Sequence, residues 1–233
     1  MSQPAFAFFD VDDTLLAVKS MFDFYRHLCL EEFKDPGRLE AFEADFRALR
    51  DAGTPREQLN HRYYTYFKGL SEAALDGMAE RWWRDLTRRR PDLFFAETVA
   101  LLRGHRRAGI TPVFVSGSCA ALLRPVAKAL EVTEVLAAPL LLDGRGYYTG
   151  LLGAPQTIGA GKKLSIELFL RSRGVHPSRC YAYGDDISDE PMLSAVGNPI
   201  AVGAGTTLAI LAARRGWPVL PIGNPAPLPA WAA

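Results

Sequence analysis

The residues best suited to chemistry in this sequence are acids and hydroxyls that follow short apolar runs. They are Asp10, Asp12 and Thr14 after residues 5–9, Ser116, Gly117 and Ser118 at the end of residues 111–117, and Asp185, Asp186 and Asp189 at the end of residues 180–185. Such runs are typical of buried parallel strands, whose carboxyl ends share one edge of a sheet. The sequence therefore predicts one pocket built from three remote segments.

A pair of lysines adds positive charge to this acidic pocket. Lys162 and Lys163 follow Gly161 at the start of a predicted helix. Several carboxylates within a few ångströms raise each other's pKa or destabilise the fold unless a cation lies among them. An oxygen-rich site suits Mg²⁺, which keeps some waters and accepts a phosphate oxygen. A lysine, a serine and the backbone N–H groups of residues 116–118 are suited to the other phosphate oxygens.

The elements that must position these residues alternate between strands and helices after residue 91. Helices are expected at about 92–107, 118–130, 161–173 and 206–215, and further strands at 199–203 and 217–220. An apolar stretch at 135–142, followed by Asp143-Gly144-Arg145-Gly146, predicts a hairpin. The alternation predicts an α/β fold, a doubly wound Rossmann-like parallel sheet covered by helices.

The stretch between the first strand and residue 91 looks helical and contains no convincing strand. Apolar residues recur at helical spacing from Leu59 to Leu70, and Ser71 is placed to cap a helix over 72–88. We expect a helical cap at 17–90, inserted into an α/β catalytic core of 1–16 and 91–233. Aromatic residues in the cap are interpreted either as its interior or as a substrate platform; they are Tyr63, Tyr64, Tyr66, Phe67, Trp82 and Trp83.

Four segments together resemble the motifs of the haloacid dehalogenase-like hydrolase superfamily. They are FFDVDDTLL at 8–16, VFVSGS at 113–118, GAGKKL at 159–164 and YGDDISDEPML at 183–193. They occur in the family's order with suitable spacing, and GWPVL at 216–220 also resembles the phosphoserine-phosphatase-like branch. The resemblance covers 4–17 and about 91–221, and in the cap it extends only to position and helical character.

The resemblance implies four catalytic residues. Asp10 would be the nucleophile that forms an aspartyl-phosphate, and Asp12 would protonate the leaving oxygen and then activate water. Ser116 and a lysine would hold the phosphoryl oxygens and stabilise their charge. The lysine is either Lys162 or Lys163, and the family pattern favours Lys162 because a glycine directly precedes it.

The resemblance also implies a metal site. Asp10, the Asp12 carbonyl and Asp185 would hold Mg²⁺, and Asp189 would orient the lysine or a metal-bound water. Asp186 either supports the metal ligands or caps a helix. Further residues assigned to substrate binding are Thr14, Lys19, Gly117 and Ser118.

Asp12 favours a phosphatase within this superfamily. A second acid two residues after the nucleophile supplies the proton transfer that phosphoester hydrolysis requires, and the family's dehalogenases lack it. A cap that restricts access favours a small phosphorylated metabolite, with phosphoserine, histidinol phosphate or a phosphocholine-type ester as candidates. Phosphoserine phosphatases carry an acid where this chain has Lys19, which would instead meet a carboxylate or a second phosphate, or face solvent.

The alternative is a phospho-accepting signalling module, or a phosphometabolite-binding module without turnover. Receiver modules also use acids, a hydroxyl and a lysine around Mg²⁺, but they lack the Asp-x-Asp pair and a large helical insert. A binding module without turnover would lack one of the motif residues, and every one of them is present.

Composition narrows the partners and the compartment. Lys+Arg 27 against Asp+Glu 26 leaves a net charge of +1, so electrostatics gives no reason to expect nucleic acid or an anionic membrane. No segment has the roughly 18 apolar residues that span a bilayer, and residues 5–9 do not resemble a signal peptide. Three widely spaced cysteines indicate a reducing cytoplasm. The Pro/Ala-rich tail at 223–233 is expected to be loosely held, and no oligomeric state is predicted.

Overall fold

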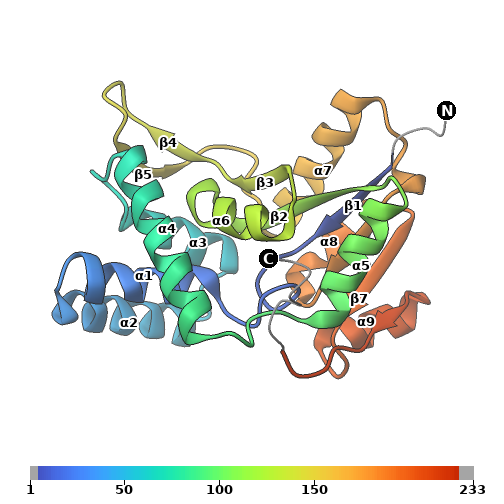
Figure 1. Ribbon diagram of the computed structural model, residues 1–233, viewed down its shortest axis with the longest axis horizontal. Coiled ribbons are helices and arrows are strands. Elements are labelled where there is room, and N and C mark those ends of the chain that lie inside the picture. Colours follow the sequence, from blue (N-terminus) through green and yellow to red (C-terminus); the bar gives the residue numbers. More distant parts are fainter. Residues whose placement is uncertain (1–4, 226–233) are drawn as a thin grey trace.

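A computed structural model describes residues 5–225, and its central element is a six-stranded sheet in the order β3-β2-β1-β6-β7-β8 (Figure 1). The strands are β1 (Phe6–Phe9), β2 (Thr111–Cys119), β3 (Glu134–Ala138), β6 (Tyr181–Gly184), β7 (Asn198–Val202) and β8 (Val219–Leu220). Every neighbouring pair in this sheet is parallel. Most of the predicted tail, residues 226–233, lies outside the described residues.

Helices cover both faces of the sheet. They are α5 (Ala96–Arg107), α6 (Ala120–Leu130), α7 (Ala160–Arg173), α8 (Glu190–Leu193) and α9 (Thr207–Arg215). Successive residues of β1 alternate between two apolar cores, with Phe9 packed in one and Phe8 in the other. Leu102 of α5 belongs to the first core and Ile166 of α7 to the second. The predicted doubly wound α/β fold is therefore confirmed.

The strand order reverses at β1, which makes the end of this strand the topological switch point of the sheet. From β1 the chain builds the sheet outward through β2 and β3 on one side, and through β6, β7 and β8 on the other. The residues that follow β1 therefore lie between the ends of β2 and β6. In open α/β sheets, ligands bind outside the strand ends at such a switch point.

The stretch between β1 and α5 is helical, as the sequence predicts, and it holds four α-helices. They are α1 (Ser20–His27), α2 (Pro36–Asp51), α3 (Arg56–Thr65) and α4 (Glu72–Arg89), with a π-helical turn at Leu28–Glu32. Ser71 caps α4 as expected, because its hydroxyl accepts a hydrogen bond from Ala74 N at 3.2 Å. The division of the chain into a cap at 17–90 and a core stays a prediction. No helix within residues 5–225 is both long and apolar enough to cross a membrane.

The aromatic residues of the cap pack inward. Tyr63, Tyr64, Phe67 and Trp82 are all 0% exposed. Phe24 of α1 lies between two of these rings, stacked on Phe67 at 6.1 Å and edge-on to Trp82 at 5.6 Å between centroids. These four residues therefore form the interior of the cap, and the interpretation of them as a substrate platform is wrong.

The two segments that connect core and cap run side by side. Ala17 N donates to Leu93 O at 2.8 Å, and Phe95 N donates to Leu15 O at 3.0 Å. Because residues 93–95 are extended by this pairing, the helix predicted from about 92 begins at Ala96 instead.

The predicted hairpin is present, and it lies against the cap. Strands β4 (Leu140–Leu142) and β5 (Tyr148–Leu152) pair antiparallel, and the Asp143 carboxylate accepts hydrogen bonds from the backbone within the turn. The far edge of β5 bonds to the residues between α3 and α4, with Gly69 N donating to Tyr148 O and Tyr148 N to Leu70 O, both at 2.8 Å. The hairpin thus joins the core strands to the cap (Figure 1).

Candidate active site

Three acidic side chains from two strand ends meet at the switch point. Asp10 directly follows β1, and its backbone N donates to Tyr183 O of β6 at 2.9 Å. Asp185 directly follows β6, and Asp189 lies one turn further on. Each of the three offers a carboxylate oxygen within 4.8 Å of the others. The sequence placed these residues at one sheet edge, and the structure brings them together there.

One lysine is buried among these acids. Lys162 Nζ lies 2.8 Å from Asp10 Oδ1 and 2.6 Å from Asp189 Oδ1, and its side chain is 4% exposed. Burial alone lowers the pKa of this ammonium, but the two carboxylates outweigh burial and the net pKa lies above its usual range. Lys163 points away, with its side chain half exposed and 3.8 Å from Glu167. Of the two lysines left open by the sequence, Lys162 is therefore the one in the pocket.

Asp189 reaches Lys162 because Gly184 leaves room for it. A Cβ at Gly184 would lie 2.6 Å from the Asp189 side chain, closer than side-chain atoms approach. Asp186 accepts a hydrogen bond from Ser188 N at 2.9 Å, and its own N donates to Asp189 Oδ2 at 3.3 Å. This reciprocal capping box shows that Asp186 is a helix cap, one of its two predicted roles. The Asp186 carboxylate also forms an ion pair with Arg56 of α3.

One carboxylate oxygen of Asp12 is hydrogen-bonded and the other has no partner. Ser20, the first residue of α1, donates to Asp12 Oδ2 from its backbone N at 2.9 Å and from its hydroxyl at 3.0 Å. Asp12 Oδ1 is buried and has no hydrogen-bond partner. Burial, with a smaller contribution from Asp10, raises the pKa of Asp12 to about 7. A carboxyl with such a pKa is able to give and take a proton near neutral pH.

The serine loop, residues 116–118 of β2, is held from several sides. Ser116 Oγ accepts from Ser118 N at 3.1 Å, and Ser116 O accepts from the Thr157 hydroxyl at 2.6 Å. The Ser118 hydroxyl lies 3.0 Å from the Ser20 hydroxyl. Ser116 and Ser118 are both buried. Ser20 and Thr157 were not predicted, since neither lies in a recognisable motif segment.

Gly117 also connects this loop to the cap. Its carbonyl oxygen accepts hydrogen bonds from Asn60 Nδ2 and from the Tyr64 hydroxyl of α3. A Cβ at Gly117 would lie 3.0 Å from Ile158 and 3.3 Å from Asn60, so a larger residue would disturb both neighbours. Asn60 was not predicted. The one feature of the sequence that could have pointed to it is that a polar residue stands on the same face of the helix as Tyr63 and Tyr64.

Two predicted substrate-binding residues have protein partners. The buried Thr14 donates its hydroxyl hydrogen to Asp185 Oδ1 at 2.8 Å and so orients that carboxylate. Lys19 Nζ lies 2.6 Å from Asp13 Oδ2, and its side chain is 46% exposed. Lys19 therefore stands beside the site in an ion pair, and neither residue is free of other contacts.

The donor set fits a hard divalent cation. Burial, followed by the charges of Asp10 and Asp189, raises the pKa of Asp185 to about 7. Burial likewise raises the pKa of Asp189 to about 6, although Lys162 opposes this effect. One buried lysine does not balance the surrounding carboxylates, and their oxygens are the ligands that Mg²⁺ prefers. The residues present therefore fit Mg²⁺, with Asp189 added to the predicted ligands.

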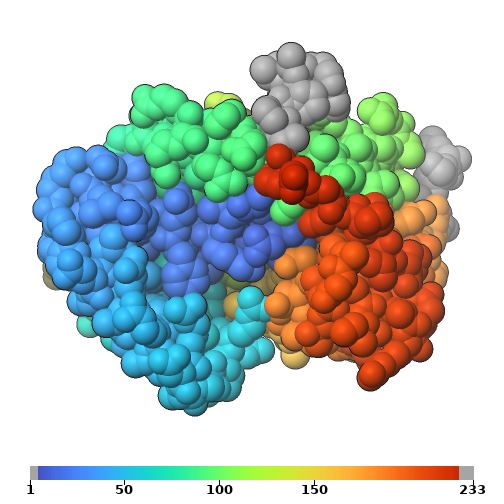
Figure 2. Space-filling model, turned by 90° about the horizontal axis from the view of Figure 1, so that it is seen from below, coloured from blue at the N-terminus to red at the C-terminus, as the bar shows by residue number. Residues whose placement is uncertain are grey.

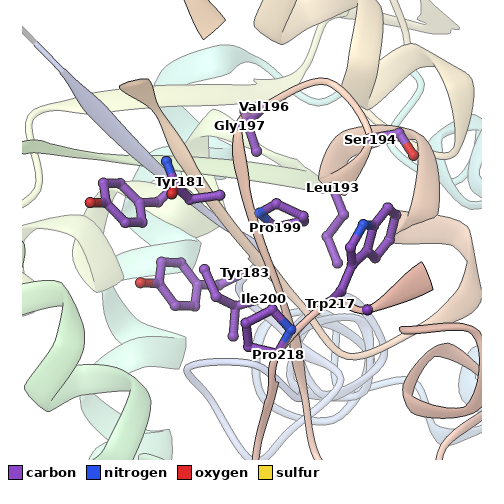
Figure 3. Close-up of a pocket in the computed structure, with 12 residues that line it drawn as sticks. Tyr181, Tyr183, Leu193, Ser194, Val196, Gly197, Pro199, Ile200, Trp217 and Pro218 are labelled. Carbon is purple, nitrogen blue, oxygen red and sulfur yellow. The ribbon is translucent and has the colours of Figure 1, made fainter. Parts of the chain in front are cut away.

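A separate hollow of about 620 Å³ lies beside the first residues of β7 and the segment that leads into β8 (Figure 3). Tyr181, Tyr183 and Trp217 contribute aromatic side chains to its wall. None of the carboxylates described above lines it, and neither does Lys162. It is therefore distinct from the acidic site.

Comparison with known sequences identifies the family. A family model described as haloacid dehalogenase-like hydrolase matches residues 7–194. A probable phosphatase of Mycobacterium tuberculosis is 32% identical over 227 residues, covering 95% of this chain and 77% of that protein. A histidinol-phosphatase of Neisseria meningitidis is 26% identical over 227 residues, covering 92% of this chain and 97% of that protein.

Solved structures show the same fold. A protein of unknown function from Bordetella pertussis has a TM-score of 0.82 and 26% identity, covering 94% of this chain and 99% of that one. A substrate-bound phosphoserine phosphatase has a TM-score of 0.64 and 15% identity, covering 94% of this chain and 93% of that one, which is a likeness of fold. The chain therefore belongs to the haloacid dehalogenase-like hydrolase family, as its motifs predicted, and is an enzyme of that family.

Proposed function

We propose that this enzyme is a Mg²⁺-dependent phosphatase that hydrolyses a small phosphomonoester through an aspartyl-phosphate on Asp10. The observation that carries the proposal is the position of the Asp10 carboxylate, held by Lys162 at the switch point and 13% exposed. The serine loop and Asp185 flank it on the two neighbouring strands. Phosphatases among the relatives support the same activity.

In the first step, Asp10 attacks phosphorus. Lys162 holds Asp10 Oδ1, so the other carboxylate oxygen forms the new O–P bond while the bond from phosphorus to the leaving oxygen breaks. Asp12 gives its proton to that leaving oxygen through Oδ1, which has no other partner. Lys162 and the Ser116 hydroxyl stabilise the charge on the phosphoryl oxygens.

In the second step, water replaces Asp10 on phosphorus. Asp12 has lost its proton, so it now takes one from the attacking water. The water oxygen bonds to phosphorus, the bond from phosphorus to Asp10 breaks, and inorganic phosphate leaves. Both aspartates then return to their starting states, as a catalytic cycle requires.

Mg²⁺ would be held by Asp10, Asp185, the Asp12 carbonyl and Asp189. When bound, it supplies positive charge that offsets the repulsion between the nucleophile and an anionic substrate. Thr14 keeps Asp185 in place through its hydrogen bond. This assignment rests on the carboxylate cluster and on its excess of negative charge.

The substrate is proposed to be a small phosphorylated metabolite. Helix α3 of the predicted cap contacts the serine loop beside the acids, which supports restricted access and hence a small substrate. Candidates are phosphoserine, histidinol phosphate and a phosphocholine-type ester. Lys19 would repel the cationic nitrogen that each of these candidates carries, so it does not select among them. A carboxylate or a second phosphate on the substrate would suit Lys19 better, although Asp13 now occupies it.

The test is a screen of phosphorylated metabolites with release of inorganic phosphate as the readout. We expect Mg²⁺-dependent turnover of at least one small phosphomonoester and of an aryl phosphate. Asp10→Asn should abolish both, while Asp92→Asn, an exposed acid-to-amide control, should leave them unchanged. Turnover by Asp10→Asn would overturn the assignment of Asp10 as the nucleophile. Phosphorylation of the protein without release of phosphate would favour a signalling module instead.

A further inference from the structure

One backbone carbonyl of the serine loop accepts two hydrogen bonds from the cap. Gly117 O accepts from Asn60 Nδ2 at 3.0 Å and from the Tyr64 hydroxyl at 2.8 Å. Asn60 is 3% exposed and Tyr64 is 0% exposed, so both donors are shielded from water. The donors are four residues apart on α3 and lie on the same side of that helix. The position of the Gly117 carbonyl therefore depends on α3.

The Gly117 carbonyl belongs to the same planar peptide as Ser118 N. Ser118 N donates to Ser116 Oγ at 3.1 Å. Rotation of this peptide would move its C=O away from α3 and its N–H away from the Ser116 hydroxyl at the same time. Hydrogen bonds to the C=O also polarise the peptide and strengthen its N–H as a donor. The cap is thus linked to Ser116 through one rigid group.

Helix α3 is itself fixed to the core, at Asn60 and in the turn that precedes it. Gln156 Nε2, from the segment before α7, donates to Asn60 Oδ1 at 2.8 Å and to Glu57 O at 3.0 Å. One turn earlier on α3, Arg56 pairs with Asp186 and donates to the Ser188 hydroxyl at 3.0 Å. Figure 2 shows the cyan segment, which includes α3, lying against the orange segment of the core.

We propose that Asn60 and Tyr64 are positioning residues, which act on Ser116 through the Gly117–Ser118 peptide. This inference rests on the proposed function of Ser116 in holding the phosphoryl group. Neither side chain touches the reacting atoms. Docking of α3 completes the orientation of the serine loop, so the cap takes part in the chemical step as well as covering the site. An undocked cap leaves the peptide without two of its hydrogen bonds.

Tyr64→Phe and Tyr63→Phe form a matched pair for testing this. Both residues are 0% exposed and adjacent on α3, but the Tyr63 hydroxyl donates to Met21 O, inside the cap, at 2.6 Å. With para-nitrophenyl phosphate and saturating Mg²⁺, Tyr64→Phe should lower kcat by about threefold to tenfold, the effect of one hydrogen bond. Tyr63→Phe should leave kcat within about twofold of wild type.

Asn60→Asp provides the second variant, since it keeps the shape but replaces the donor by an acceptor. Asp at this position still accepts from Gln156 but places an oxygen against Gly117 O, so kcat should fall by about tenfold or more. Calorimetry with inorganic phosphate and Mg²⁺ should show weaker phosphate binding by Tyr64→Phe and Asn60→Asp, and unchanged binding by Tyr63→Phe. Thermal unfolding establishes that each variant is folded.

The outcomes separate the two proposals. If wild type hydrolyses no phosphomonoester, the proposed function fails. If wild type is active and the two Tyr→Phe variants lose kcat and phosphate affinity equally, the hydroxyls stabilise the cap only and the positioning inference is wrong. A change in KM alone, with kcat unchanged in Tyr64→Phe and Asn60→Asp, would also overturn it. If Asn60→Asp does not fold, Tyr64→Phe decides.

Discussion

Lys162 and Lys163 are neighbours in sequence, yet their surroundings differ completely. Successive residues of a helix point about 100° apart, so one lysine enters the pocket and the other enters water. Lys162 lies within hydrogen-bond distance of two carboxylates and is almost fully buried. Lys163 forms a loose ion pair on an exposed surface. Because the two residues are chemically identical, any difference between the effects of substituting them must come from these surroundings.

Lys162→Met should reduce kcat by about 100-fold or more, because a charge that stabilises the transition state is lost. In Mg²⁺-free buffer it should also lower the free energy of unfolding by about 3–5 kcal/mol, since Asp10 and Asp189 then lose their buried partner. Lys163→Met should change the unfolding free energy by less than about 0.5 kcal/mol. Steady-state kinetics and urea unfolding measure both. Equal effects of the two substitutions would refute the assignment of Lys162.

Asp12→Asn should separate the two steps of the reaction. An aryl leaving group needs little protonation, so Asp10 should still be phosphorylated by an aryl phosphate. Hydrolysis should stall, because an amide does not accept the proton of the attacking water. Mass spectrometry after a rapid quench should detect a phosphorylated chain. Steady-state turnover at the wild-type rate would show that Asp12 is not the acid and base.

At the scale of elements, α5 is joined to the sheet by a half-buried histidine. His105 Nε2 lies 2.7 Å from the Tyr183 hydroxyl of β6, and its ring packs on Tyr181 at 4.5 Å between centroids. Burial lowers the pKa of His105 below its usual 6.5. The native state therefore favours the neutral imidazole, whereas the unfolded chain takes up a proton near pH 6.5.

This difference makes part of the stability depend on pH. A group whose pKa is depressed by folding contributes stability that is present above its unfolded pKa and lost as the pH falls. Between pH 7.5 and pH 5.5 this contribution of His105 should be lost, while protonation of Asp12, Asp185 and Asp189, whose pKa values folding raises, acts in the opposite direction. Compared with wild type, His105→Gln should therefore gain unfolding temperature at pH 5.5 relative to pH 7.5, because glutamine does not titrate. Calorimetric scans at both pH values measure this. An equal change of unfolding temperature in wild type and variant would show that His105 contributes nothing to the pH dependence.

At the scale of the whole molecule, cap and core are continuous. Phe24 and Trp82 of the cap belong to the same apolar cluster as Phe9 and Phe114 of the sheet. The acids of the site lie above this cluster, at the ends of β1 and β6. Their mutual repulsion opposes folding, and a bound cation relieves it. Metal binding should consequently stabilise the whole fold.

Mg²⁺ at about 100 times its Kd should raise the free energy of unfolding by about 2.7 kcal/mol. Asp185→Asn should remove most of this gain, because a charged ligand is lost while its neighbour Thr14 keeps a hydrogen-bond acceptor. Asp92→Asn, which changes an exposed acid far along the chain, should keep it. Differential scanning calorimetry with and without Mg²⁺ gives the comparison. If Mg²⁺ does not change the unfolding temperature of the wild type, the proposed metal site is wrong.

The sequence by itself determined the fold class and the acids of the site, because both are written in local patterns. Apolar runs that stop at Asp10, Ser116 and Asp185 identify buried strands and the polar residues at their carboxyl ends. The turn at Asp143 and the cap at Ser71 depend on neighbouring residues only, and both were predicted. Such features are readable because a strand end, a turn or a helix cap is decided by a few adjacent side chains.

Only the tertiary structure decided which remote side chains support these acids. Ser20 meets Ser118 across 98 residues, and Asn60 meets Gly117 across 57. Residues 93–95 are extended rather than helical because they pair with residues 15–17. A serine or an asparagine has the same local preferences whether or not a distant carbonyl lies within reach. Such partners are set by how the helices pack over the sheet, and no pattern along the chain records that packing.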